Sequence, residues 1–206
     1  MNTLHCGLNE YIKKRDQRIG RVGEFLSTTI RPFLVKSKAP GFHLEVGCGH
    51  GHWLSSFARL KPDDIFIGID LLSKRIRKSD LKKNNQKLDN LFFLKAEANE
   101  FLEAIPKDLN ILSTFIMFPD PWPKKRHFKK RLMQNEFLQA LSNVSSPNSN
   151  LFFRTDHQGY FNWTTNLIEK NASWQKSPEK WPHESSSFFQ DLFQSSFTLT
   201  ATHKPD

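Results

Sequence analysis

The chain has 206 residues, only two of which are cysteines, and a formal net charge of +9. This length suits one α/β domain, whereas Cys6 and Cys48 are too few for a disulfide framework or a four-ligand zinc site. No apolar run approaches the roughly 18 residues of a membrane helix, and the amino terminus lacks a stretch like that of a signal peptide. We therefore expect a cytoplasmic protein without a membrane span or a bound metal.

Charge and aromatic content indicate the class of partner. The estimated pI is near 9.6, and the chain contains 19 Phe and 5 Trp. Lysine and arginine neutralise phosphates and aromatic rings stack on bases, so nucleic acid is the leading candidate. The alternative is a basic charge balance without any such partner.

Residues 1–41 form a segment in which basic residues outnumber acidic ones. Pro32 and Pro40 are expected to interrupt any long helix there. We interpret the segment as a partly ordered basic arm that precedes a domain of residues 42–206. Its cations either contact phosphates or are simply solvated. They are Lys13, Lys14, Arg15, Arg18, Arg21, Arg31, Lys36 and Lys38.

Residues 42–70 have the pattern of a strand, a glycine-rich turn, a helix and a second strand. Gly47, Gly49 and Gly51 stand where the chain must turn sharply and where a ligand can approach the backbone closely. Asp70 ends the second strand, about 20 residues beyond the turn, where a carboxylate suits two hydrogen bonds to ribose hydroxyls. The unit therefore predicts a nucleoside-binding site.

Two residues beside this turn argue against a dinucleotide. The fingerprint G-x-G-x-x-G requires glycine at the position of His52, and Glu45 precedes the glycines. A carboxylate is a poor neighbour for a phosphate but a good one for an ammonium or sulfonium cation. The pattern E-x-G-x-G-x-G resembles the first motif of the class I S-adenosylmethionine (SAM) methyltransferases, although glycine-rich turns alone occur in many α/β proteins.

The next elements continue the alternation of strand and helix. Residues 71–88 predict an amphipathic helix with one basic face, which either holds RNA or only solubilises the surface. Residues 90–98 predict a third strand that ends beside the cofactor. Glu97 and Ala98 stand where adenine is usually read; the alternative is that Glu97 is an acid in the first turn of the next helix.

The densest chemistry follows the fourth predicted strand, residues 111–118. Three prolines keep the backbone extended, which fixes Asp120 over the carboxyl edge of the sheet, and Trp122 offers a flat face for stacking. Six cations follow without an acid among them, which favours a grip on phosphates over a merely solvated patch. They are Lys124, Lys125, Arg126, Lys129, Lys130 and Arg131.

The run from Phe118 to Arg131 resembles the signature F-P-D-P-W-x-K-K-R-H-x-K-R-R of the tRNA (guanine-N7)-methyltransferases, and the similarity extends from Glu45 to Asp156. The resemblance implies a doubly wound, mostly parallel sheet of the Rossmann-like class I methyltransferase type. It also implies SAM as cofactor, and transfer of its methyl group to N7 of guanine 46 in the variable loop of tRNA. Asp120 is then both the catalytic carboxylate and a cofactor-binding residue.

The remaining chain follows the family less closely. A helix is predicted over residues 135–141 and a turn over residues 145–150, before a short fifth strand. In the family a Thr-Asp pair after this strand helps to hold the target nucleotide, which assigns Asp156 to the substrate; a helix cap is the alternative. Ser187 and Gln190 stand where the family has T-x-[FY]-E near the target base, so the hydroxyl is kept and a charge is lost.

The resemblance assigns Lys124 to the substrate and the other five cations of the signature to tRNA phosphates. Two other functions stay open: a methyltransferase acting on an exocyclic amine, because Asp-Pro and an aromatic residue resemble its D-P-P-[FYW] motif, and a non-catalytic RNA-binding protein on a degenerate fold. A nicotinamide-dependent reductase is disfavoured by His52. The sequence does not decide between a monomer and a homodimer.

Overall fold

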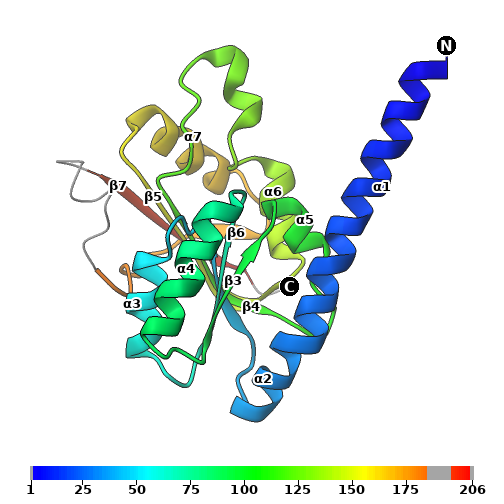
Figure 1. The fold of residues 1–206 in the computed structure, drawn as a ribbon. Coiled ribbons are helices and arrows are strands. Elements are labelled where there is room, and N and C mark those ends of the chain that lie inside the picture. The colour runs from blue at the N-terminus through cyan, green and yellow to red at the C-terminus, as the bar shows by residue number, and fades with distance from the viewer. Residues whose placement is uncertain (1, 185–195, 205–206) are drawn as a thin grey trace.

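A seven-stranded sheet with helices on both faces forms the centre of the protein (Figure 1). The computed structural model describes residues 2–184 and 196–204, and its strand order is β3-β2-β1-β4-β5-β7-β6. Of the described strands, β7 alone runs against its neighbours, which confirms the predicted doubly wound, mostly parallel sheet. The strands are β1 (Phe42–Val46), β2 (Ile65–Asp70), β3 (Leu91–Lys95), β4 (Ile111–Met117), β5 (Ser145–Thr155), β6 (Trp174–Lys176) and β7 (Phe197–His203).

The helices divide between two hydrophobic clusters, one on each face of the sheet. The smaller cluster contains side chains of α3 (His52–Leu60) and α4 (Ser73–Asn85). A 3-10 helix, η2 (Lys125–Lys130), lies in the loop after β4. The larger cluster takes side chains from α1 (Asn2–Phe25), the π-helix η1 (Leu26–Ile30), α2 (Arg31–Ser37), α5 (Ala98–Glu103), α6 (Asn135–Ser142) and α7 (Gln158–Glu169).

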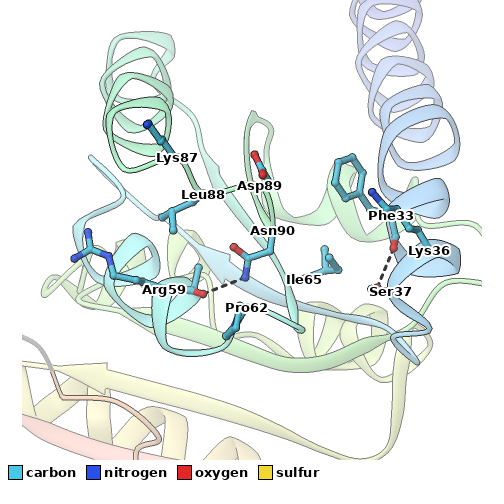
Figure 2. Close-up of a pocket in the computed structure, with 11 residues that line it drawn as sticks. Phe33, Lys36, Ser37, Arg59, Pro62, Ile65, Lys87, Leu88, Asp89 and Asn90 are labelled. Atoms are coloured by element: carbon cyan, nitrogen blue, oxygen red, sulfur yellow. Dashed lines mark hydrogen bonds between the residues drawn. The ribbon is translucent and has the colours of Figure 1, made fainter.

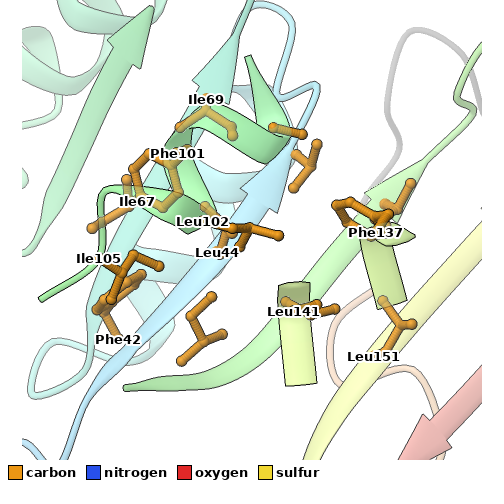
Figure 3. Close-up of a cluster of buried hydrophobic side chains, with 14 of the residues drawn as sticks. Phe42, Leu44, Ile67, Ile69, Phe101, Leu102, Ile105, Phe137, Leu141 and Leu151 are labelled. Carbon is orange, nitrogen blue, oxygen red and sulfur yellow. The ribbon is translucent and has the colours of Figure 1, made fainter. Parts of the chain in front are cut away.

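Strand position explains the apolar runs in the sequence. Every residue of β2 is buried, because this central strand pairs with β1 and β3 and is covered on both faces. Figure 3 shows Leu44 of β1 and Ile67 of β2 packed against Phe101 and Leu102 of α5. Phe66 lies on the opposite face, in the smaller cluster. Burial on both faces fixes the register of the strands, and thereby the place where each strand ends.

The amino-terminal segment is a continuous helical run, so the prediction that Pro32 interrupts any long helix there is wrong. Helices α1, η1 and α2 follow one another without a break from Asn2 to Ser37. Pro32 does not interrupt them, because it stands in the first turn of α2, directly after the wider π turn, where its missing N–H costs little. The helix ends as predicted before Pro40, with Lys38 in the left-handed conformation. Of the helices that the structure describes, none has the length and apolar character needed to cross a membrane.

Three of the eight cations of this segment hold it against the body of the protein. Arg15 pairs with Glu103, and Arg18 donates two hydrogen bonds to Glu100 at 2.6 and 2.8 Å. Arg31 binds Asp108 in the same bidentate way. On the inner side of the helix the larger cluster takes up Val22, Leu26, Ile30 and Leu34. The segment from Val22 onward therefore belongs to the folded core.

The turn predicted after α6 is instead part of β5. Strand β4 pairs first with Ser145 and next with Asn150, so residues 146–149 bulge out between these two pairs. Pro147 has no N–H to give to the ladder, and Asn148 is left-handed with φ 62°. The turn residues were recognised correctly, but they interrupt a strand rather than precede it.

Candidate functional site

A cavity of about 770 Å³ opens at the carboxyl edge of the sheet. The ends of β1, β2 and β4 contribute Val46, Ile69 and Met117, and the loops after them contribute the polar groups. Ligands of doubly wound proteins bind at this edge. Of the predicted site residues, the cavity wall contains Gly47, Asp70, Glu97, Ala98, Asp120, Lys129, Lys130 and Arg131.

Asp70 connects three structural elements around this cavity. One carboxylate oxygen accepts the backbone N–H of Leu72 at 2.8 Å, and the other accepts that of Gly49 at 3.1 Å. The second oxygen also pairs with Arg75 at 3.3 Å. The carboxylate thus joins the glycine turn to the start of α4. Its place in the cavity wall agrees with the predicted ribose contact, which must compete with Arg75.

The three glycines have different roles. A Cβ added at Gly47 or Gly49 would meet no atom within 4 Å, so open space lies beside the backbone at both positions. Gly51 has a positive φ of 66°, and its Cβ would collide with the Phe93 ring. The first two glycines therefore leave room for a ligand, while Gly51 allows close packing between the turn and β3.

Glu45 lies buried behind the turn instead of in the cavity wall. Its residue is 3% exposed, and Oε2 has no hydrogen-bond partner among the described residues. Burial, helped by the nearby charge of Asp70, raises the pKa of Glu45 to about 8. An unpartnered buried carboxyl beside an open glycine turn fits a ligand that carries an ammonium group. The carboxyl group of Glu45 is therefore compatible with the ammonium group of SAM.

Glu97 precedes α5 as its N-cap and also stands in the cavity wall. Its side chain accepts the backbone N–H of Glu100 at 3.0 Å, so it is the N-cap of α5. It also lines the cavity with Ala98 and Asn99. The helix cap fixes the orientation of the carboxylate at the place where an adenine contact is predicted.

The proline-rich loop after β4 places Asp120 on the cavity. Phe118 and Trp122, at either side of the Pro119–Pro121 run, have positive φ values of 49° and 43°. Such values are uncommon for residues with a side chain and persist only where the surroundings enforce them. The exposed Asp120 thereby shares one cavity with Gly47 and Asp70.

The predicted phosphate-binding cations separate into two groups in space. Lys129 and Lys130 are exposed in the cavity wall, and the Nζ atom of Lys130 lies 4.6 Å from the centre of the Trp122 ring. Lys124, Lys125 and Arg126 are exposed on or beside η2 but do not line the cavity.

Arg131 is not placed as a phosphate contact, which corrects the prediction. It is 3% exposed, and its guanidinium lies 3.7 Å from the centre of the Phe128 ring, with Tyr160 and Trp163 of α7 around it. Its Nε donates to the carbonyl of Pro121 at 2.8 Å. Burial among these rings lowers the pKa of Arg131. The side chain therefore braces the loop that carries Asp120.

Asp156 is exposed after β5 and does not line the cavity. The alternative expectation, that it caps the next helix, is wrong, because His157 is the N-cap of α7 and accepts the N–H of Tyr160. Ser187 and Gln190 lie outside the described residues. Just before them the chain is anchored, since Arg154 donates to both carboxylate oxygens of Glu184 at 2.6 and 2.9 Å.

Several cavity residues were not predicted from the sequence. Arg75 follows Asp70 by five residues, a spacing that puts an arginine of the first helical turn within reach of a carboxylate at a strand end. Leu72 and Phe137 supply apolar wall. Their sequence context is that of ordinary core or surface positions, so no pattern distinguished them.

A second cavity, of about 410 Å³, lies at the amino edge of the sheet, where β2 and β3 begin (Figure 2). Asn90 is fixed there by hydrogen bonds to the carbonyls of Ala58, Lys61 and Asp64. Of the predicted site residues that the structure describes, none lines this cavity. Within the described part of the chain, no group of three or more His, Cys, Asp or Glu is arranged to hold a metal ion.

Sequence comparisons agree with this geometry. A family profile described as "Putative methyltransferase" matches residues 40–191. A tRNA (guanine-N(7)-)-methyltransferase of Prochlorococcus marinus (strain AS9601) is 33% identical over 149 residues, 71% of this chain and 71% of the relative. The enzyme of the same name from Mycoplasmopsis pulmonis (strain UAB CTIP) is 32% identical over 141 residues, 68% of this chain and 67% of the relative.

Solved structures share the fold. The aminoglycoside resistance methyltransferase NpmB1 superimposes with a TM-score of 0.57 at 19% identity, over 82% of this chain and 91% of that chain. A mutant 16S rRNA (adenine(1408)-N(1))-methyltransferase with cosubstrate SAM, from Catenulisporales acidiphilia, gives 0.57 at 17% identity, over 83% and 90%. At these identities the likeness concerns the fold alone.

Proposed function

Since the chain belongs to the tRNA (guanine-N(7)-)-methyltransferase family, we propose that it methylates N7 of a guanine in tRNA, at position 46 of the variable loop, in the cytoplasm. The observation that carries the proposal is the shared cavity of Gly47, Asp70 and Asp120. One edge of the sheet thus offers a nucleoside site and an exposed carboxylate held over it by a braced loop.

SAM supplies an electrophilic methyl group when it is bound. The residues that would hold it are Asp70 for the ribose, Glu97 with Ala98 for the adenine, and Glu45 for the ammonium group. The open space beside Gly47 and the unpartnered Oε2 of Glu45 support these assignments. Both features suit a cationic nucleoside better than a pyrophosphate, because a phosphate would be repelled by the carboxylates.

Asp120 is proposed to orient the target base and to stabilise its developing charge. N7 of guanine is a bare hydrogen-bond acceptor, so no proton has to leave before it attacks. A carboxylate can accept hydrogen bonds from N1 and the amino group of guanine, which fixes the direction of N7. The same carboxylate stabilises the positive charge that the ring gains on methylation. Placement and electrostatics then suffice, without a strong general base.

Exposed cations next to Asp120 are proposed to bind the phosphates of the RNA. Lys129 and Lys130 lie in the cavity wall, and Lys124 and Lys125 stand at the start of η2. Guanine must leave its stack to reach the cavity, at a cost of a few kcal/mol that stacking on an aromatic face such as Trp122 can offset. Phosphate contacts on both sides of the base would hold the opened strand.

Product analysis tests the proposal directly. The protein is incubated with unmodified tRNA and SAM labelled in its methyl group, and the nucleosides of the digested RNA are identified. We expect 7-methylguanosine, located at position 46. A label on an exocyclic amine of adenine or cytosine would replace the proposed reaction by the rival one. Binding of tRNA without any binding of SAM would indicate a non-catalytic RNA-binding protein.

A further inference from the structure

Helix α4 presents a row of cations to the glycine turn. Arg75, Lys78 and Lys82 are spaced by three and four residues and therefore share one face of the helix. Ser79 fixes this face against the turn, because its hydroxyl donates to the carbonyl of Gly49 at 3.1 Å. The row begins at Arg75 in the cavity wall and leads away from it for about 10 Å, given the rise of an α-helix.

Two histidines lie beside this row, His50 in the turn and His52 as the first residue of α3. His50 and His52 are exposed, and their ring centres lie 6.3 Å apart in a nearly perpendicular arrangement. The three cations of the row all act on His50, and Lys82 acts on His52 as well. Their repulsion and partial desolvation lower the pKa of both imidazoles. Side chains from two elements therefore concentrate positive potential at one place.

Within the described part of the chain, Arg75 pairs with Asp70, but Lys78, Lys82, His50 and His52 form no ion pair with an acid. Lys82 Nζ is buried and has no hydrogen-bond partner among the described residues, and burial lowers its pKa. Asp70 faces His50 but already accepts two backbone N–H groups and Arg75. A buried ammonium group without an acceptor, such as that of Lys82, is expensive unless an anion completes the arrangement.

We propose that His50, His52, Lys78 and Lys82 form a site for a backbone phosphate of RNA. The proposal rests on the proposed function, because it supplies a second hold on the tRNA whose guanine enters the cavity. The signature loop provides Lys129 and Lys130 at one part of the cavity rim, and α4 continues from the rim at Arg75. An RNA strand that runs along the signature loop and α4 is held at two points, with its target base between them.

A nucleic-acid strand fits this site better than a small anion. The cations follow one face of the helix, with Arg75 and Lys78 exposed and the Nζ atom of Lys82 buried further along, rather than gathering around one enclosed pocket. Imidazoles surrounded by ammonium and guanidinium groups are also unsuited to a metal ion, which binds neutral histidines and gains from acidic neighbours.

Matched variants of α4 test the site. Lys78→Gln removes a charge of the row, and Arg77→Gln removes an equal charge from an exposed neighbour outside it. We expect Lys78→Gln to weaken binding of unmodified tRNA by about five- to tenfold and to reduce the slope of log K against log salt by about one, whereas Arg77→Gln keeps the slope of the wild type. Equal slopes in wild type and both variants would overturn the proposal.

The histidines give a second readout. Binding of a phosphate favours their charged forms against Arg75, Lys78 and Lys82, so tRNA affinity should rise several-fold between pH 7.5 and pH 6. A double variant, His50→Asn with His52→Asn, should lose most of this rise. If its pH profile matches that of the wild type, the histidines do not face the phosphate and the site as proposed is wrong.

Failure of this site and failure of the proposed function give different results. If wild-type protein produces 7-methylguanosine while Lys78→Gln keeps full tRNA affinity and salt slope, only the α4 site is wrong. If wild-type protein binds tRNA through the row but produces no 7-methylguanosine, the proposed reaction is wrong. SAM affinity should be unchanged in Lys78→Gln, because Lys78 does not line the cavity.

Discussion

Replacing Glu45 by glutamine should make the free protein more stable and weaken its hold on the cofactor. The carboxyl is buried with a pKa of about 8, compared with 4.5 in the unfolded chain, and Asp70 adds to the effect of burial. A shift of this size corresponds to about 5 kcal/mol, of which about 3 kcal/mol is lost by pH 7. Because the pKa is raised on folding, the contribution of Glu45 to wild-type stability is greatest below pH 4.5 and is lost progressively up to pH 8.

Glutamine occupies nearly the same volume and does not ionise. The melting temperature of Glu45→Gln relative to wild type should therefore rise between pH 5 and pH 8, by several degrees for a chain of this size. Thermal unfolding of the cofactor-free proteins across this range measures the difference. Glu136→Gln is a matched control, since Glu136 also lines the cavity but is exposed. The rise predicted for Glu45→Gln should be absent in this variant, because Glu136 is not buried.

Cofactor binding should change in the opposite direction. An ammonium group is held by ionised Glu45, so wild-type affinity for SAM is reduced about tenfold at pH 7 and about 100-fold at pH 6 relative to the fully ionised site. Calorimetry should show this dependence in wild type and its loss in Glu45→Gln, together with weaker binding at pH 8. A stability difference that is flat with pH, or equal pH profiles for SAM binding, would refute the reasoning.

Three further changes test individual parts of the site. Asp120→Asn should reduce single-turnover methylation by about 100-fold or more, because the charge on the guanine ring is no longer balanced, while SAM affinity measured by calorimetry changes little. Arg131→Met should lower stability by about 2–4 kcal/mol in urea unfolding and reduce turnover without altering the salt slope of tRNA binding, whereas Lys129→Met should reduce that slope. Gly51→Ala should destabilise the protein more than Gly47→Ala, because only the former places a Cβ against Phe93.

The centre of the fold and of the site could be predicted because local chemistry determines them. The alternation of apolar residues in β1, the glycine turn and the apolar run that begins β2 specify a strand, a turn and a buried strand. Parallel strands then bring their carboxyl ends to one edge. This is why Asp70 and Asp120, distant in the sequence, could be expected on the same cavity.

Side-chain direction could not be predicted from the same patterns. Arg131 ends a run of cations that the sequence treats alike, but residues of α7 about 30 positions later enclose its guanidinium. From the sequence, Glu97 fits a helix cap and a ligand contact equally well, because the first residue of the helix is not known. Pro32 reads as a helix breaker, because the π turn that accommodates it has no signal in the sequence.

The amino-terminal helix sets a limit on how far this protein can be shortened. The portion that matches the family profile begins at residue 40, yet Leu26, Ile30 and Leu34 close the interior from outside that portion. A fragment cut to the matched region would lose these side chains and expose part of the larger hydrophobic cluster to water. If residues are removed from the amino terminus only up to but not including Arg15, the apolar helix residues and the ion pairs of Arg15 and Arg18 are both kept.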